Sequence, residues 1–191
     1  MSGVLGFISR AKRSLIGVRS TPEFRPMLAT LTQRPFPAEG WVFEPKLDGE
    51  RCLAYRVGDD VKLISRTQQR MNNSYPDIVD ALLEQPLKEF IVDGEIVAVK
   101  DTISSLSLLQ RRMQIQDPDL ARRSGAEVFF YVFDLLYLGG RDVTSMPLLE
   151  RKSLLLQSLS FGGPLCYSSY REKDGEAFYE EVRKKGWQGD Q

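Results

Sequence analysis

A lysine, a carboxylate and an arginine stand close together in one short stretch of this chain. Lys46 ends an apolar run, Asp48 follows two residues later, and Gly49 and Arg51 complete the stretch. The apolar run predicts a strand over residues 41–47, and the Asp-Gly pair predicts a tight turn after it. An amine on a stiff strand, a nearby carboxylate and a permanent cation are the groups that covalent nucleotidyl transfer needs.

Each of these groups has a chemical requirement. Lys46 must lose its proton before it can attack phosphorus, and a free lysine has a pKa of about 10.4. Burial and neighbouring cations are expected to assist that loss. Asp48 could orient the amine or hold a metal, or it could be only a turn residue. Arg51 has a planar, charged fork that suits phosphate or ribose oxygens. A lone lysine, by contrast, is more often a surface residue in an ion pair.

Four further segments accompany this stretch in a particular order. They are Pro26-Met27-Leu28-Ala29, Ser65-Arg66, Asp93-Gly94-Glu95 and the aromatic run Tyr131–Leu136. Together with Lys-x-Asp-Gly-x-Arg, they resemble the nucleotidyltransferase (adenylation) domain of ATP-dependent DNA ligases, and most of all the ligase module of bacterial end-joining ligases. The resemblance covers roughly Pro26 to Gly189. RNA ligases and messenger-RNA capping enzymes share the superfamily, but the Pro-Met-Leu-Ala opening and the aromatic run favour a DNA ligase.

The resemblance implies a role for each site residue. Lys46 is expected to be the nucleophile that carries AMP, with Asp48 as its catalytic neighbour. Phe133 is expected to stack on the adenine ring, and Glu95 to lie near the ribose hydroxyls and a metal ion. The other expected nucleotide contacts are Glu44, Arg51 and Arg66, and Arg66 is also a candidate contact for DNA phosphate. ATP or AMP and Mg²⁺ or Mn²⁺ are therefore the expected cofactors.

The chain departs from the family at two places. Thr67-Gln68 replaces the family's Asn-Gly, so the loop after Arg66 is expected to differ. Near the C-terminus Gln188 stands where a metal-binding glutamate is expected, and the sequence stops before the paired lysines and the oligonucleotide-binding (OB) fold that usually follow. A neutral amide is a much poorer ligand for a hard cation than a carboxylate. The sequence therefore predicts an adenylation domain that is incomplete at its C-terminus, has no OB-fold and is impaired in complete ligation.

The leading hypothesis is an ATP-dependent DNA ligase (nucleotidyltransferase) domain. It would form a covalent lysyl-AMP intermediate and pass AMP to nicked or broken DNA during repair, recombination and non-homologous end joining. Other end-joining proteins are candidate partners, membranes are not, and the expected location is the bacterial cytoplasm in association with the nucleoid. Two alternatives stay open: a catalytically impaired nucleotide-binding fragment, or pseudo-ligase module, and a relative of RNA ligases or capping enzymes.

Composition narrows the chemistry further. The 191 residues carry 26 Lys+Arg and 26 Asp+Glu, so the net charge is zero and no dominant basic surface is available for DNA. The absence of histidine excludes a histidine general base, a serine-histidine triad and a histidine-ligated zinc. The only cysteines, Cys52 and Cys166, are expected to be free thiols in a reducing compartment.

Periodicity and turn residues predict an α+β fold, and the resemblance implies an antiparallel-sheet, ATP-grasp-like nucleotidyltransferase domain over residues 23–191. Residues 1–22 are expected to form a basic extension, more in keeping with a linker or capping helix than with a transit peptide. The predicted elements are a hairpin over 51–65, a helix over 76–84 capped by Ser74, a bent strand or strand pair over 90–99, a helix from Ser104 or Ser105 to Met113, a buried strand over 128–136, and helices over 148–159 and 175–186.

Overall fold

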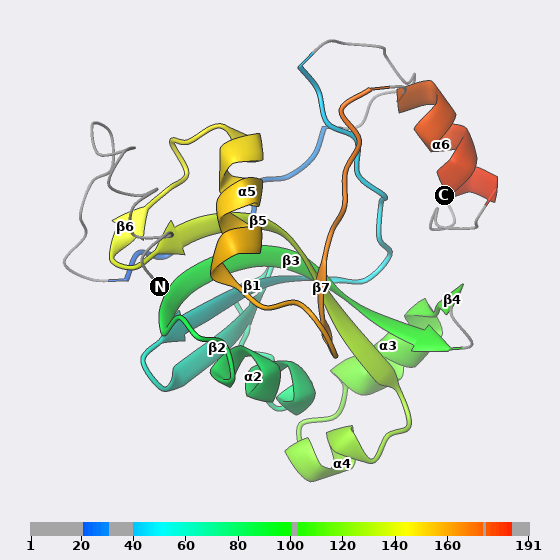
Figure 1. Ribbon diagram of the computed structural model, residues 1–191. Coiled ribbons are helices and arrows are strands. Elements are labelled where there is room, and N and C mark those ends of the chain that lie inside the picture. The colour runs from blue at the N-terminus through cyan, green and yellow to red at the C-terminus, as the bar shows by residue number, and fades with distance from the viewer. Residues whose placement is uncertain (1–20, 31–39, 101–102, 174, 185–191) are drawn as a thin grey trace.

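A seven-stranded sheet forms the centre of the computed structural model, which describes residues 21–30, 40–100, 103–173 and 175–184 (Figure 1). The strand order is β2-β1-β3-β5-β6, while β4 pairs with β3 and β7 pairs with β5. The strands are β1 Glu50–Val57, β2 Asp60–Ser65, β3 Glu89–Lys100, β4 Ile103–Ser104, β5 Glu127–Leu138, β6 Arg141–Asp142 and β7 Leu165–Tyr167. Every strand pair is antiparallel except β5 with β7, so the predicted α+β class with a mainly antiparallel sheet is confirmed.

Local sequence explains the predicted hairpin of β1 and β2. Val57 pairs with Asp60, which leaves Gly58 and Asp59 as a two-residue turn. Gly58 has a φ of 63°, a left-handed conformation that glycine adopts without steric cost. The turn determines the register of the whole pair, from Val57 back to Cys52 opposite Ser65. The prediction of this hairpin is confirmed.

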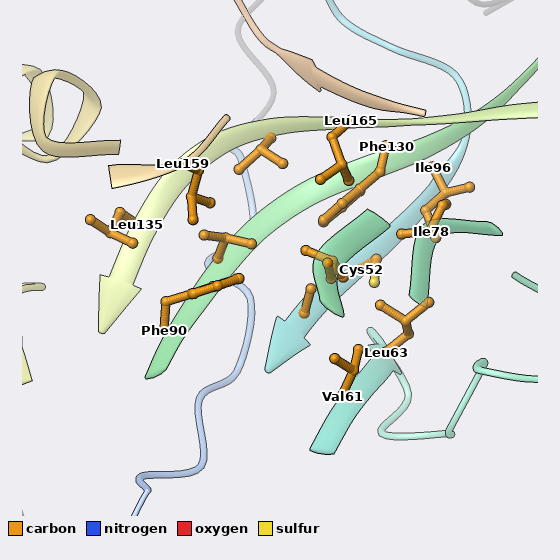
Figure 2. Packing of buried hydrophobic residues seen from close by; sticks show 14 of the residues in the cluster. Cys52, Val61, Leu63, Ile78, Phe90, Ile96, Phe130, Leu135, Leu159 and Leu165 are labelled. Carbon is orange, nitrogen blue, oxygen red and sulfur yellow. The ribbon is translucent and has the colours of Figure 1, made fainter. Parts of the chain in front are cut away.

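The described helices are α2 Pro76–Leu83, α3 Leu106–Met113, α4 Pro118–Arg122, α5 Leu148–Ser158 and α6 Gly175–Lys184. Side chains of α2, α3 and α5 join the strands in one buried cluster, whereas α4 contacts α2 and the first residue of α6 lies against Phe43. Figure 2 shows Ile96 of β3 and Phe130 of β5 in one buried cluster with Ile78 of α2 and Leu159 after α5. Side chains alternate between the two faces of a strand. The residues between these core positions therefore point to the opposite face, where the predicted site residues of the sheet lie.

The structure corrects two local predictions and decides a third. Residues 41–47 do not form a strand of the sheet, because their one bridge is between Phe43 and the distant Arg171. The N-cap of α2 is Tyr75, and no side chain caps it. The predicted cap, Ser74, instead donates its hydroxyl to the carbonyls of Met113, the last residue of α3, and of Ile115. The bent strand or strand pair predicted over 90–99 is one strand, β3, with a shift in register against β5 at Asp93-Gly94.

Other features lie outside what periodicity predicted. The short elements α4, β6 and β7 were not predicted, because each is too short to show a hydrophobic period. Most of the predicted basic extension, residues 1–20, and the C-terminal residue Gln188 lie outside the described residues. Within the described part of the chain, no helix combines the length and the apolar character that crossing a membrane requires.

Arg112 of α3 is a buried hydrogen-bonding centre for the helical side of the fold. Only 2% of this arginine is exposed, and it joins α2, α3 and α4. Its guanidinium donates to the carbonyls of Ser74, Ala121 and Ala126, to the hydroxyl of Ser124 and to the carboxylate of Asp77. Removing one partner from such a network leaves several buried acceptors unsatisfied.

We therefore expect Arg112→Met to lower the free energy of unfolding by about 3–5 kcal/mol. Urea denaturation followed by circular dichroism would measure the loss. Arg111→Met, one residue earlier on the exposed side of α3, is the matched control and should change stability little. Equal, small losses in the two variants would show that the network does not stabilise the fold.

Candidate functional site

Four of the seven predicted site residues point to or border the sheet face opposite the helical core. Arg51 of β1 pairs with Glu95 of β3, and Glu95 pairs in turn with Tyr131 of β5. Phe133 is left unpaired at the register shift between the pairs Gly94–Val132 and Asp93–Asp134, and its ring lies against the guanidinium of Arg51. Lys46 precedes this row on the segment that leads into β1, and its charge acts on the carboxyl of Glu95. The structure thus brings Lys46, Arg51, Glu95 and Phe133 together.

Arg51 is held by two contacts at once. Its Nε and Nη2 donate to the two carboxylate oxygens of Asp93 over 2.6 and 2.9 Å, and its guanidinium lies 4.4 Å from the centre of the Phe133 ring. Burial disfavours the charge of Arg51, but the hydrogen bonds and charge of Asp93 outweigh burial and raise its pKa. Arg51 is therefore a permanent cation, with its fork on Asp93 and its plane over Phe133.

The ion pair extends across the sheet into α5. Asp93 is 4% exposed and pairs in register with Asp134 of β5. Asp134 accepts two hydrogen bonds, of 2.8 and 2.7 Å, from Arg151 of α5. Burial raises the pKa of Asp93, although Arg51 works against this rise. Each buried carboxylate thus has its own arginine, which keeps this charged layer compatible with burial.

Glu95 is the most perturbed carboxyl of the site. Burial raises its pKa to about 7, against the opposing effects of Arg51, of a hydrogen bond from the backbone N–H of Gly49 and of Lys46, while Asp93 adds to the rise. Glu95 therefore changes its protonation near neutral pH. Within the described residues no group of three or more Asp, Glu, Cys or His could hold a metal ion, so the metal role of Glu95 stays a prediction.

Lys46 itself is exposed. Its side chain is 71% accessible and its ammonium lies 3.9 Å from a carboxylate oxygen of Asp48, whose side chain is 40% accessible. In this structure, burial therefore does not assist the loss of the Lys46 proton. The expectation that Asp48 lies beside the amine is met in distance, but its catalytic role stays a prediction.

The Lys46 segment is held on both sides of the lysine. Before it, Phe43 and Arg171 exchange backbone hydrogen bonds of 2.8 and 2.9 Å, and Figure 1 shows the cyan segment running beside the orange chain after β7. After it, Gly49 lies directly on β3, where a Cβ would stand 2.2 Å from the carbonyl oxygen of Ile96. No larger residue fits at Gly49 without moving the segment away from β3.

Glu44 does not lie open towards a ligand. Its carboxylate accepts a 2.6 Å hydrogen bond from Lys152 of α5, a lysine whose side chain is 0% exposed. Nothing in the sequence singled out Lys152, because one lysine on an amphipathic helix normally faces solvent. The nucleotide contact predicted for Glu44 stays a prediction.

Arg66 directly follows β2. The last residue of β2, Ser65, pairs with Cys52 of β1, so the backbone of Arg66 lies next to that of Arg51 while its side chain is exposed. The loop after it keeps a glycine-like shape. Gln68, which replaces the family's glycine, has a φ of 65° and is the only described non-glycine residue with a positive φ. The expected difference of this loop from the family's stays a prediction.

The aromatic side chains of β5 are divided between the two faces of the sheet. Phe130 is fully buried in the helical core, whereas Phe129 and Tyr131 are half-buried on the face of Phe133. Of these three aromatic residues, Phe130 alone is therefore a fully buried core residue. Phe133 has one face covered by Arg51, which the sequence did not predict.

Comparison with known proteins gives a consistent result. A family model described as "ATP dependent DNA ligase domain" matches residues 26–189. DNA ligase C of Mycobacterium tuberculosis is 35% identical over 146 residues, which are 74% of this chain and 39% of that protein. DNA ligase C2 of Mycolicibacterium smegmatis is 34% identical over 144 residues, or 75% of this chain and 40% of that protein.

A solved structure described as mycobacterial DNA ligase D complexed with ATP and MES superimposes with a TM-score of 0.68 at 29% identity. The match covers 86% of this chain and 52% of that one. The chain therefore spans about two fifths of these two curated relatives and about half of this structure.

The raised pKa of Glu95 makes stability depend on pH. Between about pH 4.5 and 7 the unfolded chain has lost this proton while the folded chain retains it, so the raised pKa of Glu95 lowers stability as pH rises through this window. Glu95→Gln removes this dependence. From pH 5 to pH 8 the wild type should lose about 1–3 kcal/mol more free energy of unfolding than Glu95→Gln does. Urea denaturation of both proteins at the two pH values measures this difference. A constant difference between the two proteins would contradict the burial of this carboxyl.

The left-handed residue in the loop gives a second prediction. Gln68→Gly should raise the free energy of unfolding by about 0.5–1 kcal/mol, because glycine removes the steric cost of this conformation. The control is Gln69→Gly, next in the chain and without a positive φ, which should lower stability instead. Thermal or urea unfolding of both variants measures the effect, and destabilisation by Gln68→Gly would mean that the loop does not adopt this backbone.

Proposed function

The chain belongs to the family of ATP-dependent DNA ligase domains, and we propose that it acts as the adenylation domain of such a ligase. The observation that carries the proposal is the meeting of Arg51, Glu95 and Phe133 on one sheet face, with Lys46 on the segment beside them. These are an amine, a cation, an acid and an aromatic surface, which together suit a purine nucleotide and its phosphates.

The proposed reaction has three steps. The Nζ of Lys46, once deprotonated, attacks the α-phosphorus of ATP, so that a P–N bond forms and the bond to pyrophosphate breaks. The 5′-phosphate of a DNA break then displaces the lysine and takes AMP. The 3′-hydroxyl of the facing strand finally attacks that 5′-phosphate, forms the phosphodiester and releases AMP. Pre-positioned charges account for most of the catalysis in such phosphoryl-type transfers.

In this proposal Arg51 and Phe133 separate when nucleotide enters. Phe133 stacks on adenine, and the Arg51 fork serves ribose or phosphate oxygens instead of only Asp93. Asp48 orients the Lys46 amine, and Glu95 takes the ribose hydroxyls. Glu95 is also the protein's proposed ligand for Mg²⁺ or Mn²⁺, which neutralises phosphate charge when bound. Arg66, whose side chain is exposed at the end of β2 beside Arg51, is proposed to contact nucleotide or DNA phosphate.

Nicked or broken DNA is the proposed substrate, and repair by end joining is the proposed setting, since a DNA ligase D is among the similar structures. The family match disfavours an RNA ligase or a capping enzyme. The second candidate function is a nucleotide-binding module with little turnover. The exposure of Lys46 favours it, because an amine in water is poorly activated for attack.

Labelling by ATP that is radioactive at the α-phosphate separates the two candidates. The wild-type chain should become labelled through an acid-labile bond, and Lys46→Ala should abolish the label because it removes the proposed nucleophile. Lys46→Arg should fail as well, since arginine does not deprotonate at accessible pH. Lys62→Ala, which changes an exposed lysine of β2, is the control and should label normally.

Full labelling of Lys46→Ala would remove Lys46 from the mechanism. Binding of ATP to the wild type without any label would favour the second candidate function.

A further inference from the structure

The position of Lys46 depends on a segment that the sheet does not hold by strand pairing. Between Phe43 and Gly49 no described residue pairs with a strand, and the side-chain partner of Lys46 is the half-exposed Asp48. A nucleophile reacts efficiently only when it is held about 3–3.5 Å from its target, and a misplacement of about 1 Å can slow the reaction a hundredfold. Something other than the sheet must therefore hold this segment close to Lys46.

Lys152 provides such a contact from the interior. Its ammonium donates 2.6 Å to Glu44 Oε1 and 3.2 Å to the backbone oxygen of Ser168. The rings of Tyr167 and Tyr170 lie 5.1 and 5.3 Å from the same nitrogen. The lysine is fully buried, and aromatic faces stabilise a cation without replacing a carboxylate. Glu44 is thus the anion that compensates a buried charge.

This geometry ties three parts of the fold together at one atom. Lys152 comes from α5, Ser168 follows β7, and Glu44 lies two residues before Lys46. The Phe43–Arg171 bridge joins the same two chain segments one residue further back. A shift of the Lys152 ammonium would therefore move Glu44, and with it the backbone that carries Lys46.

We propose that Lys152 is a positioning residue for Lys46. It holds the Glu44-Pro45-Lys46 segment through its bond to Glu44 and does not itself touch the nucleotide. The proposal rests on the proposed function, because it assigns Lys152 to the placement of that reaction's nucleophile. It also gives Glu44 a role different from direct nucleotide binding: its carboxylate faces Lys152.

The test compares Lys152→Met, Glu44→Gln and the double variant. Methionine keeps much of the length and volume of lysine, and glutamine keeps an acceptor for Lys152, so Glu44→Gln serves if Lys152→Met does not fold. Lys88→Met is the matched control, since it removes an exposed lysine that pairs with the exposed Asp59 and not with the Lys46 segment. Two measurements are made on each folded protein.

The first measurement is the single-turnover rate of lysyl-AMP formation at saturating ATP, with the ATP Kd measured separately. Lys152→Met should lower the rate by about tenfold to a hundredfold while the Kd changes little. Glu44→Gln should lower it less, and the double variant should be no slower than Lys152→Met because the two residues act through one bond. A loss of ATP affinity in Glu44→Gln, with no loss of rate, would overturn the proposal in favour of direct nucleotide contact.

The second measurement is amide hydrogen exchange of peptides over residues 43–49 and over β1 and β3. Lys152→Met should speed exchange in the first peptide and leave the strands unchanged, whereas Lys88→Met should change neither. Equal exchange in all peptides, or faster exchange everywhere, would overturn the proposal, since the contact would then have no local effect or only a general stabilising one. This readout decides the role of Lys152 even if the wild type is never labelled by ATP, which would refute the proposed function alone.

Discussion

The bidentate pair of Arg51 and Asp93 is the interaction on which the organisation of this sheet face depends. Asp93 is almost fully buried, and a buried carboxylate without a partner would destabilise the fold by several kilocalories per mole. Its neighbour across the strands is another carboxylate, Asp134, so a second arginine has to arrive from α5. The two pairs form a layer of alternating charge. In this layer each carboxylate stays ionised and buried only because an arginine is held beside it.

This layer explains why the face can be polar and still well packed. Arg51 lies over Phe133, so the ring is shielded on one side by a cation instead of by apolar side chains. Glu95 lies beside the same arginine, and its proton is retained to near neutral pH because burial outweighs the attraction of Arg51. Strained or costly groups of this kind gather at functional sites. On the opposite face the described strands meet the helices mainly through aliphatic and aromatic residues, with Glu50 of β1 as an acid that accepts a hydrogen bond from Tyr75.

Local sequence patterns were enough to predict part of the fold and part of the candidate site. The hairpin at Gly58, the helix over α5 and the grouping of Arg51 and Glu95 follow from turn chemistry, period and the motif order. Partners far apart in sequence could not be read in this way. The pairing of Phe43 with Arg171 replaced the strand predicted for 41–47, and the bond from Lys152 to Glu44 joins residues 108 positions apart. Both depend on how β7 and α5 close over the sheet, which no local window contains.

Gly175 links the last described helix to the same segment. This first residue of α6 is packed so closely on the ring of Phe43 that a Cβ would lie 2.5 Å from its carbons, and Arg171 contacts both Phe43 and Phe178 of α6. Hard contacts of this kind transmit displacement instead of absorbing it. The placement of α6 and that of Phe43, three positions before Lys46, are therefore coupled through this contact, because no side chain larger than glycine fits at position 175 unless Phe43 moves.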